Sequence, residues 1–451
     1  MTRTPAILAL LLIPAVATAQ VPATQAAPGA GPAPGQRLVV DITGGISEPM
    51  PIAIPAMPTP QAQATAAGQT DALGRQVAQI VTNDLKGSGL FKPVSTDHAV
   101  AYPQVSAPDY GYWTTTGASA LVQGFVQANG DGTLTVGCYL YDVYSKNEMA
   151  RQGFVVTPQF WRRAAHKCAD TVYTRLTGEG PYFDSRVAYV SETGPKAHRT
   201  KRLAIMDQDG ANHRFLTNGQ SIVLTPRFAP NQQSIVYMSF EGNRPRIYTY
   251  DIGSGRNRLV VDRANLTFAP RYSPDGRSIV FSMSTGGNTN IYRVAASGGQ
   301  PQQLTSAPGI DTAPSYSPDG SKIVFESDRS GGQQIYVMNA DGSGQHRVSF
   351  GGGRYATPVW SPRGDLIAFT KLSTFNVGVM APDGSGEKIL THGWQDEGPT
   401  WSPNGRVIMF FRTGQGSGKA DLWSVDLTGV NERAIPTPLD GSDPSWSPLL
   451  P

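Results

Sequence analysis

Arg271-Tyr272-Ser273-Pro274-Asp275-Gly276 is the stretch that decides the fold, because variants of it occur five more times in the C-terminal half of this 451-residue chain. The copies are Phe228-Ala229-Pro230-Asn231, Tyr316-Ser317-Pro318-Asp319-Gly320, Trp360-Ser361-Pro362-Arg363-Gly364, Trp401-Ser402-Pro403-Asn404-Gly405 and Trp446-Ser447-Pro448. Their prolines lie 44, 44, 44, 41 and 45 residues apart. A period of about 40 to 45 residues with strand-like residues between the copies predicts a β-propeller, with one four-stranded blade per repeat.

Each copy of the repeat predicts a turn followed by strands. Ser-Pro-Asp-Gly suits a type I turn, with Pro at its second position and Gly at its fourth. Five residues after each of the first five prolines, an alternating apolar pair indicates a strand with one buried face. These pairs are Ile235/Tyr237, Ile279/Phe281, Ile323/Phe325, Ile367/Phe369 and Ile408/Phe410. A third strand and a short fourth strand complete each predicted blade.

The two ends of the repeat region complement each other. Val187 and Tyr189 begin a repeat that no Ser-Pro precedes, and Pro448 ends the last copy before a second strand. We therefore expect the strand at Ser445 to Pro448 to join the blade of residues 187 to 217. This closure gives a six-bladed ring over residues 183–451 and leaves no open sheet edge.

The first 36 residues have the composition of an export signal followed by a linker. Residues 1–19 combine the basic Arg3, an apolar run and Ala17-Thr18-Ala19, which predicts a cleaved signal peptide. The apolar run is too short for a permanent membrane anchor. Residues 20–36 are rich in Ala, Pro and Gly, which predicts a flexible leader. We expect a mature protein that is soluble outside the cytoplasm.

Residues 37–182 contain no repeat and predict a small mixed α/β domain, so the whole chain is an α+β protein of two domains. Leu38 to Ile42 is expected to form a strand, and a hairpin is expected from Ala120 to Val143. Two helices carry apolar stripes: one over residues 70–87, with Thr70 as its expected cap, and one over about residues 160–176. Both stripes are buried if the helices cover one side of the sheet.

The two cysteines fall on apolar positions, Cys138 in the hairpin and Cys168 on the second helix stripe. A structural disulfide and a pair of buried thiols both fit these positions. A redox or metal site does not, because neither CxxC nor histidine spacing is present.

Motifs for catalysis are missing. No G-x-S-x-G or H-E-x-x-H occurs in the sequence. Asp207-Gln208-Asp209-Gly210 resembles the start of a Ca²⁺ loop, but Asn339-Ala340-Asp341-Gly342 occupies the same place in its own blade, which favours a turn. The net charge is only +3 and the sequence has no long basic run, so it does not predict a basic surface that binds nucleic acid. The sequence thus predicts no catalytic residue, metal or cofactor.

Loops before the inner strands are the candidate site, because propellers place function on loops that rigid blades support. An exported propeller hydrolase acting on envelope peptide or glycan is the alternative to a binding protein. Clustered carboxylates of shifted pKa in the tunnel would favour the hydrolase.

Four segments carry a specific resemblance to a known family. They are Gln79-Ile80-Val81-Thr82-Asn83-Asp84-Leu85-Lys86-Gly87-Ser88-Gly89-Leu90-Phe91, Trp161-Arg162-Arg163-Ala164-Ala165-His166-Lys167, Arg175-Leu176-Thr177-Gly178-Glu179 and Leu203-Ala204-Ile205-Met206-Asp207-Gln208-Asp209-Gly210-Ala211-Asn212. Joined to the propeller repeats, they resemble the TolB family of the Tol-Pal envelope system of Gram-negative bacteria. The resemblance implies a monomeric, non-enzymatic periplasmic protein without membrane insertion.

The resemblance also implies two protein partners. The propeller face of the family binds Pal, the peptidoglycan-associated outer-membrane lipoprotein, and the segment after the signal peptide binds the C-terminal domain of TolA. Together they draw the outer membrane inward at division and preserve envelope integrity. By offset from the repeat prolines, Leu266, Ala269 and Thr312 match family positions that face Pal. The predicted Pal-binding rim also includes Thr267, Asp311, Tyr355, Glu397 and Asp443. Leu266 departs from the polar residue expected of the family.

The expected TolA segment includes Gln20, Val21, Arg37 and Val39. If TolA captures this segment as an added strand, the prolines at 22, 28, 32 and 34 interrupt its hydrogen bonding. Residues 37 to 42 are the alternative binding segment.

Overall fold

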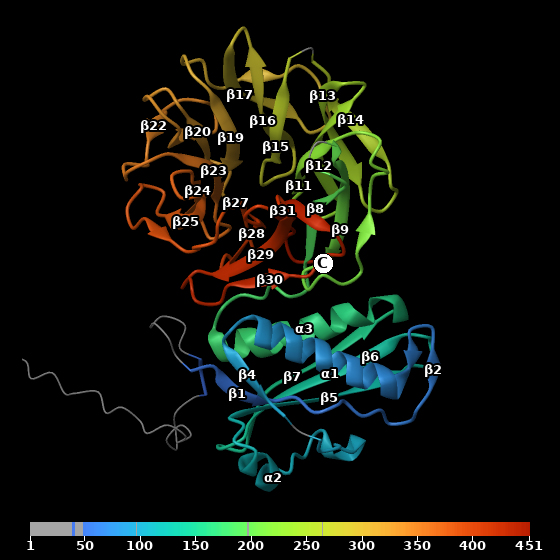
Figure 1. Cartoon of the computed structure of the whole chain (residues 1–451). Helices are drawn as coiled ribbons and strands as arrows, with labels where there is room; N and C mark the ends of the chain where they lie inside the picture. Colours follow the sequence, from blue (N-terminus) through green and yellow to red (C-terminus); the bar gives the residue numbers. More distant parts are fainter. Residues whose placement is uncertain (1–37, 41–47, 96, 196–197, 264) are drawn as a thin grey trace, which may run out of the picture.

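The structure is a computed structural model that describes residues 38–40, 48–95, 97–195, 198–263 and 265–451. The expected signal peptide, the leader and the site residues Gln20, Val21 and Arg37 lie outside the described residues. A small α/β domain packs against one side of a propeller (Figure 1). Among the described residues, no helix is long and apolar enough to cross a membrane.

The N-terminal domain is built on a five-stranded sheet of order β4-β1-β5-β6-β7. Its strands are β1 (Met50–Ala53), β4 (Phe91–Val94), β5 (Ala120–Ala128), β6 (Leu134–Asp142) and β7 (Asn147–Val156). β1 is parallel to β4 and β5, and the remaining pairs are antiparallel, so the sheet is mixed as predicted. β2 (Ala64–Thr65) and β3 (Gly68–Gln69) form a separate short ribbon.

Two long helices, α1 (Thr70–Gly87) and α3 (Trp161–Thr177), cover one face of this sheet and lie between it and the propeller (Figure 1). The predicted stripes are buried, with Val77 and Leu85 of α1 and Val172 of α3 fully inaccessible. The short α2 (Tyr110–Thr115) lies on the other side, and single 3-10 turns occupy Tyr102–Gln104 and Pro158–Phe160.

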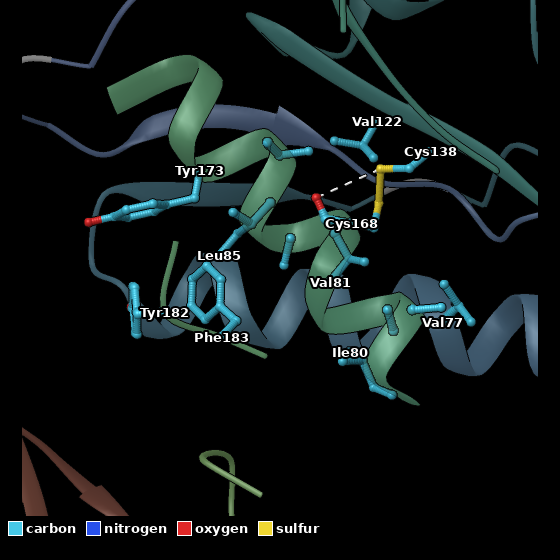
Figure 2. Packing of buried hydrophobic residues seen from close by; sticks show 14 of the residues in the cluster. Val77, Ile80, Val81, Leu85, Val122, Cys138, Cys168, Tyr173, Tyr182 and Phe183 are labelled. Carbon is cyan, nitrogen blue, oxygen red and sulfur yellow. Dashed lines mark hydrogen bonds between the residues drawn. A yellow bond between two sulfur atoms is a disulfide. The ribbon is translucent and has the colours of Figure 1, made fainter. Parts of the chain in front are cut away.

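A disulfide between Cys138 and Cys168 joins β6 to α3 (Figure 2). Of the two alternatives that the sequence left open, a structural disulfide and a pair of buried thiols, the structure has the disulfide. Both residues lie in the same hydrophobic core as Val81 and Val122, so the bond links the sheet to its helical cover from inside.

Two predictions for the N-terminal domain are wrong. Of the strand predicted from Leu38 to Ile42, Leu38–Val40 is not a strand, and residues 41 and 42 lie outside the described residues. The Val40 amide donates to the Leu176 carbonyl at 2.9 Å, so Val40 is bound to the end of α3. Thr70 is the first residue of α1 and not its cap, because its hydroxyl accepts the Gln63 amide at 3.1 Å instead of a helix amide.

The propeller has six four-stranded sheets. Blade 1 consists of β8 (Arg186–Thr193), β9 (Thr200–Asp207), β10 (Arg214–Phe215) and the last strand, β31 (Asp440–Trp446). Blade 2 has β11 (Val223–Phe228), β12 (Ser234–Glu241), β13 (Arg244–Asp251) and β14 (Asn257–Val261); blade 3 has β15 (Thr267–Tyr272), β16 (Ser278–Thr285), β17 (Asn288–Ala295) and β18 (Gln302–Gln303); blade 4 has β19 (Asp311–Tyr316), β20 (Lys322–Ser327), β21 (Gln334–Asn339) and β22 (His346–Arg347). Blade 5 has β23 (Tyr355–Trp360), β24 (Ile367–Lys371), β25 (Asn376–Met380) and β26 (Lys388–Ile389); blade 6 has β27 (Asp396–Trp401), β28 (Val407–Thr413), β29 (Ala420–Asp426) and β30 (Arg433–Ile435).

Closure of the ring by the C-terminal strand is confirmed. β31 pairs antiparallel with β8, with Ser445 opposite Ala188 and Trp446 opposite Val187. The predicted turn is confirmed too, since the Gly276 amide donates to the Ser273 carbonyl at 2.9 Å.

One hydrophobic core continues from the helices of the N-terminal domain into blades 1 and 6. Tyr173 and Tyr182 of the N-terminal part share this core with Tyr189, Leu422 and Trp446 of the propeller. Figure 2 shows Tyr173, Tyr182 and Phe183 packed together beside α3. Because this contact is apolar and continuous, the two parts are expected to unfold as one unit.

Polar contacts also cross this junction. His166 Nδ1 of α3 lies 2.6 Å from Asp84 Oδ2 of α1, and Gln208 of blade 1 donates to Asp84 Oδ1 at 2.8 Å. Residues 207–211 form the expected turn, and its carboxylates bind Arg162, with 2.5 Å between Arg162 Nη2 and Asp209 Oδ2. These carboxylates are therefore engaged by the N-terminal domain.

Candidate functional site

The inner strand of every blade contains a β-bulge at the same place. The register slips between Phe268 and Arg271 in blade 3, and equivalent slips occur in the other five blades. At each slip, the residue before the strand proline has a positive φ. These residues are Thr225 (48°), Ala269 (50°), Ala313 (51°), Thr357 (50°), Gly398 (64°) and Asp443 (49°).

A residue before proline normally adopts an extended conformation, and a left-handed one costs a non-glycine residue about 1–2 kcal/mol. Carboxylates support two of the bulges: Glu326 accepts the Thr357 amide at 2.7 Å, and Asp443 accepts the Thr225 amide at 3.2 Å. Both contacts link neighbouring blades. The bulges therefore form a rigid ring at the end of the tunnel where the inner strands begin.

Sequence reasoning missed Glu326. Burial raises the pKa of this carboxyl, against the hydrogen bonds from Thr312 and the Thr357 amide. The sequence did contain a signal: Glu326 directly follows the apolar run Ile323-Val324-Phe325 of a strand, where an acidic residue is unusual and requires a partner.

Four of the predicted site residues, Thr267, Asp311, Thr312 and Tyr355, are buried. Asp311 pairs with Arg329 at 2.7 Å, and the Tyr355 hydroxyl lies 2.6 Å from both Glu387 and Lys371. These four side chains are therefore not exposed at the rim, and their predicted contact with Pal stays a prediction. The bulge offsets the alternation of the strand, so the residues just before it point into the blade instead of out of the rim.

Large apolar side chains are exposed in the loop just before each inner strand. Leu266 is 45% exposed, Trp394 56% and Phe350 72%. The full set, one residue per blade, is Ile222, Leu266, Ile310, Phe350, Trp394 and Leu439. We call this set the apolar ring; only Leu266 was singled out from the sequence. Several exposed apolar side chains on one rim are typical of an interaction surface.

Ala269, Glu397 and Asp443 are half-buried at the same end of the tunnel. Burial, then the charges of Asp443 and Asp396, raise the pKa of Glu397. The structure thus brings these three predicted residues and Leu266 to one rim. Val39 is exposed, but it lies on the N-terminal domain, beside the end of α3.

The N-terminal domain contacts the opposite end of the inner strands. Asn404, in one repeat turn, donates to the Gly180 carbonyl at 2.8 Å, and Arg363, in another, pairs with Glu179. Six-residue strands separate the two ends by about 20 Å. The apolar ring therefore lies on the face away from the N-terminal domain, where a partner has access to it.

This architecture is that of a closed six-bladed propeller joined to a small α/β domain, with an accessible apolar rim. Two family models cover it: the TolB amino-terminal domain matches residues 38–149, and the TolB beta propeller domain matches residues 173–450. The chain belongs to the TolB family of non-enzymatic Tol-Pal system proteins. This membership decides against the hydrolase alternative.

Relatives cover nearly the whole chain. It is 79% identical over 417 residues to the Tol-Pal system protein TolB of Zymomonas mobilis subsp. mobilis, covering 92% of this chain and 91% of the relative. It is 80% identical over 425 residues to that of Rhizorhabdus wittichii, covering 94% and 97%. The crystal structure of TolB from Acinetobacter baumannii is similar with a TM-score of 0.78 and 28% identity, covering 91% of this chain and 100% of that one.

Proposed function

We propose that this protein acts in the periplasm, where its propeller rim binds the Pal lipoprotein and its N-terminal segment binds the C-terminal domain of TolA. The protein thereby links the outer and inner membranes for outer-membrane invagination at division. The observation that carries the Pal assignment is the apolar ring, because the loop before every inner strand carries one exposed apolar side chain and these loops lie at the same end of the propeller. Membership of the TolB family supports the choice of partners.

The rim suits a tight contact for two physical reasons. A large apolar side chain contributes about 1.5–3 kcal/mol when it becomes fully buried. Burial of a few such side chains therefore offsets much of the free energy that association costs in lost translational and rotational freedom. Glu326 and Asp443 already fix the backbone of the bulges beneath these side chains. Binding therefore loses little conformational entropy at the rim. Glu397 and Asp443 add an acidic component beside the apolar one.

The TolA assignment rests on the position of Val39. Leu38 and Val40 are buried, whereas Val39 is exposed between them. The hydrogen bond from the Val40 amide to the Leu176 carbonyl holds these residues at the end of α3. The proposed TolA segment consists of Val39 together with Gln20, Val21 and Arg37, which precede it in the chain. In this proposal the mature chain begins at residue 20, the α/β domain spans residues 37–182 and the propeller spans residues 183–451.

Calorimetric titration of residues 20–451 with the soluble domain of Pal from the same organism tests the rim. Leu266→Arg and Ile310→Arg are each expected to weaken binding by about 10- to 100-fold, because each removes an apolar contact and places a charge in the interface. Leu259→Arg is the matched control, since Leu259 is 43% exposed but lies on the outer strand of blade 2. Unchanged affinity in both rim variants, with folding intact by circular dichroism, would refute the Pal assignment.

A second titration separates the two partners. A chain that begins at Leu38 and carries Val39→Arg, a change at an exposed side chain, is expected to lose binding to the C-terminal domain of TolA and to keep binding to Pal. Full TolA affinity in this shortened chain would contradict the N-terminal assignment and would leave the rim assignment untouched.

A further inference from the structure

A ring of six side chains lines the tunnel two residues beyond the bulges. Arg271 pairs with Val280 in the sheet register, and the equivalent pairing occurs in every blade. The six residues are Arg227, Arg271, Ser315, Val359, Thr400 and Ser445. They lie at the floor of a cavity of about 460 Å³ that extends to the repeat turns, on the side of the N-terminal domain.

Two arginines of neighbouring blades are the charged residues of this cavity. The described residues that line it include no Asp or Glu. Arg227 Nη1 donates to the carbonyls of Pro226 at 2.7 Å and Pro444 at 3.4 Å. Across the described part of the chain, Arg271 has no carboxylate within 4.0 Å. Burial, and then the charge of Arg227, hold the pKa of Arg271 well below its ordinary value. A half-buried guanidinium that lines a cavity and has no carboxylate within 4.0 Å favours the binding of an anion.

Hydroxyl groups occupy three of the four other positions of the ring, two of them in the blades beside the arginines. Ser315 accepts the Trp360 amide at 3.3 Å, Thr400 accepts the Trp446 amide at 3.1 Å, and Ser445 accepts the Phe228 amide at 3.2 Å. Each contact uses the hydroxyl oxygen as an acceptor and leaves the hydroxyl hydrogen to donate. The floor of the cavity therefore presents donors to a ligand, which again fits an anion.

The walls of the cavity are aromatic and apolar. Each repeat contributes one aromatic residue and one proline to them; the aromatic residues are Phe228, Tyr272, Tyr316, Trp360, Trp401 and Trp446. The indole nitrogens of Trp360, Trp401 and Trp446 already donate within the protein, so these rings offer mainly apolar surface. A cavity with such walls and a few polar groups on its floor is typical of small-molecule sites.

We propose that this cavity binds a small organic anion, a phosphate or carboxylate attached to a ring-containing or apolar body, with Arg227 and Arg271 holding the anionic group. The site lies at the opposite end of the tunnel from the apolar ring. The inference therefore goes beyond the proposed binding of Pal and TolA and does not depend on it.

Calorimetry on the mature chain at constant ionic strength tests the site with four probes: phenyl phosphate, benzoate, inorganic phosphate and phenol. Phenyl phosphate or benzoate is expected to bind saturably with a stoichiometry of one, and comparison of the two shows which anionic group is preferred. Inorganic phosphate is expected to bind more weakly, because it lacks the apolar body. Phenol is expected to show no saturable binding, because it lacks the charge.

Variants locate the binding. Arg271→Gln and Arg227→Gln are each expected to weaken the preferred probe by about tenfold or more, as the loss of a charge-assisted hydrogen bond does. Arg277→Gln is the matched control, because Arg277 is exposed in the same repeat turn and does not line the cavity. Lack of saturable binding by both organic anions, equal binding of phenol, or an equal loss in the control would overturn the proposal. Circular dichroism identifies a variant that fails to fold, and the other arginine variant then provides the test.

Discussion

The buried pair of Asp84 and His166 makes the stability of the whole protein depend on pH. The pair lies at the junction of α1, α3 and blade 1, and both side chains are almost inaccessible. Burial alone would lower the pKa of His166, but the charge of Asp84 and the hydrogen bond to it raise the pKa to about 9. An unfolded histidine has a pKa of about 6.5.

The sign of the effect follows from these two values. The pKa of His166 is higher in the folded than in the unfolded protein. Its contribution to the free energy of unfolding is therefore complete below about pH 6.5 and disappears as the pH rises through about 9. A difference of about 2.5 units corresponds to about 3 kcal/mol of unfolding free energy. Burial raises the pKa of Asp84, against the opposing effect of His166, so the cost of its buried charge is present at high pH and is relieved, not increased, as the pH falls.

The assay compares wild type with the double variant Asp84→Asn, His166→Gln by urea unfolding from about pH 6.5 to pH 10. Removing both partners avoids a lone buried charge, which would titrate by itself. The stability of wild type relative to the variant is expected to fall by about 3 kcal/mol across this range. The exposed His392→Gln serves as control and is expected to show no such trend. A difference between wild type and double variant that stays constant with pH would refute the reasoning.

Two further predictions concern covalent and backbone features. The double variant Cys138→Ala, Cys168→Ala is expected to lose about 3–4 kcal/mol in urea unfolding, because the disulfide closes a loop with a sequence separation of 30; equal stability of oxidised wild type and variant would contradict this. Ala269→Val is expected to lose about 1–2 kcal/mol, because a β-branched residue tolerates a φ of 50° poorly, whereas Ala269→Gly is expected to be neutral or slightly stabilising. If both Ala269 variants lose the same free energy of unfolding in urea, side-chain packing and not backbone conformation determines stability at this position.

The propeller was predictable because its signals are local. The turn at Ser273-Pro274-Asp275-Gly276 and the alternating pair Ile279/Phe281 each specify a few residues, and repetition at a fixed period supplies the ring. α1 and α3 were predictable for the same reason, since each carries a continuous apolar stripe. Leu38–Val40 was misread as a strand because its apolar residues pack against the end of a helix that lies far away in the sequence.

The direction of the rim side chains was not predictable from the repeat. One inserted residue at the bulge changes which side chains point outward, and the alternating pattern does not reveal it. For this reason the sequence did not show that Thr267, Asp311 and Tyr355, which were predicted at the Pal-binding rim, are buried. The apolar ring escaped notice because each member is a single apolar residue in a loop, a common occurrence that needs no explanation until six of them share a face.

The pairing of β31 with β8 has a consequence for the order in which the molecule is made. Synthesis proceeds from the N-terminus, so the first blade waits for its inner strand until the final dozen or so residues of the chain have emerged. Until then β8 has an unpaired edge, and the shared core lacks Trp446. The native ring therefore forms only when residues 440–446 are present, and a chain that lacks them is left with an unpaired edge at β8 that favours aggregation.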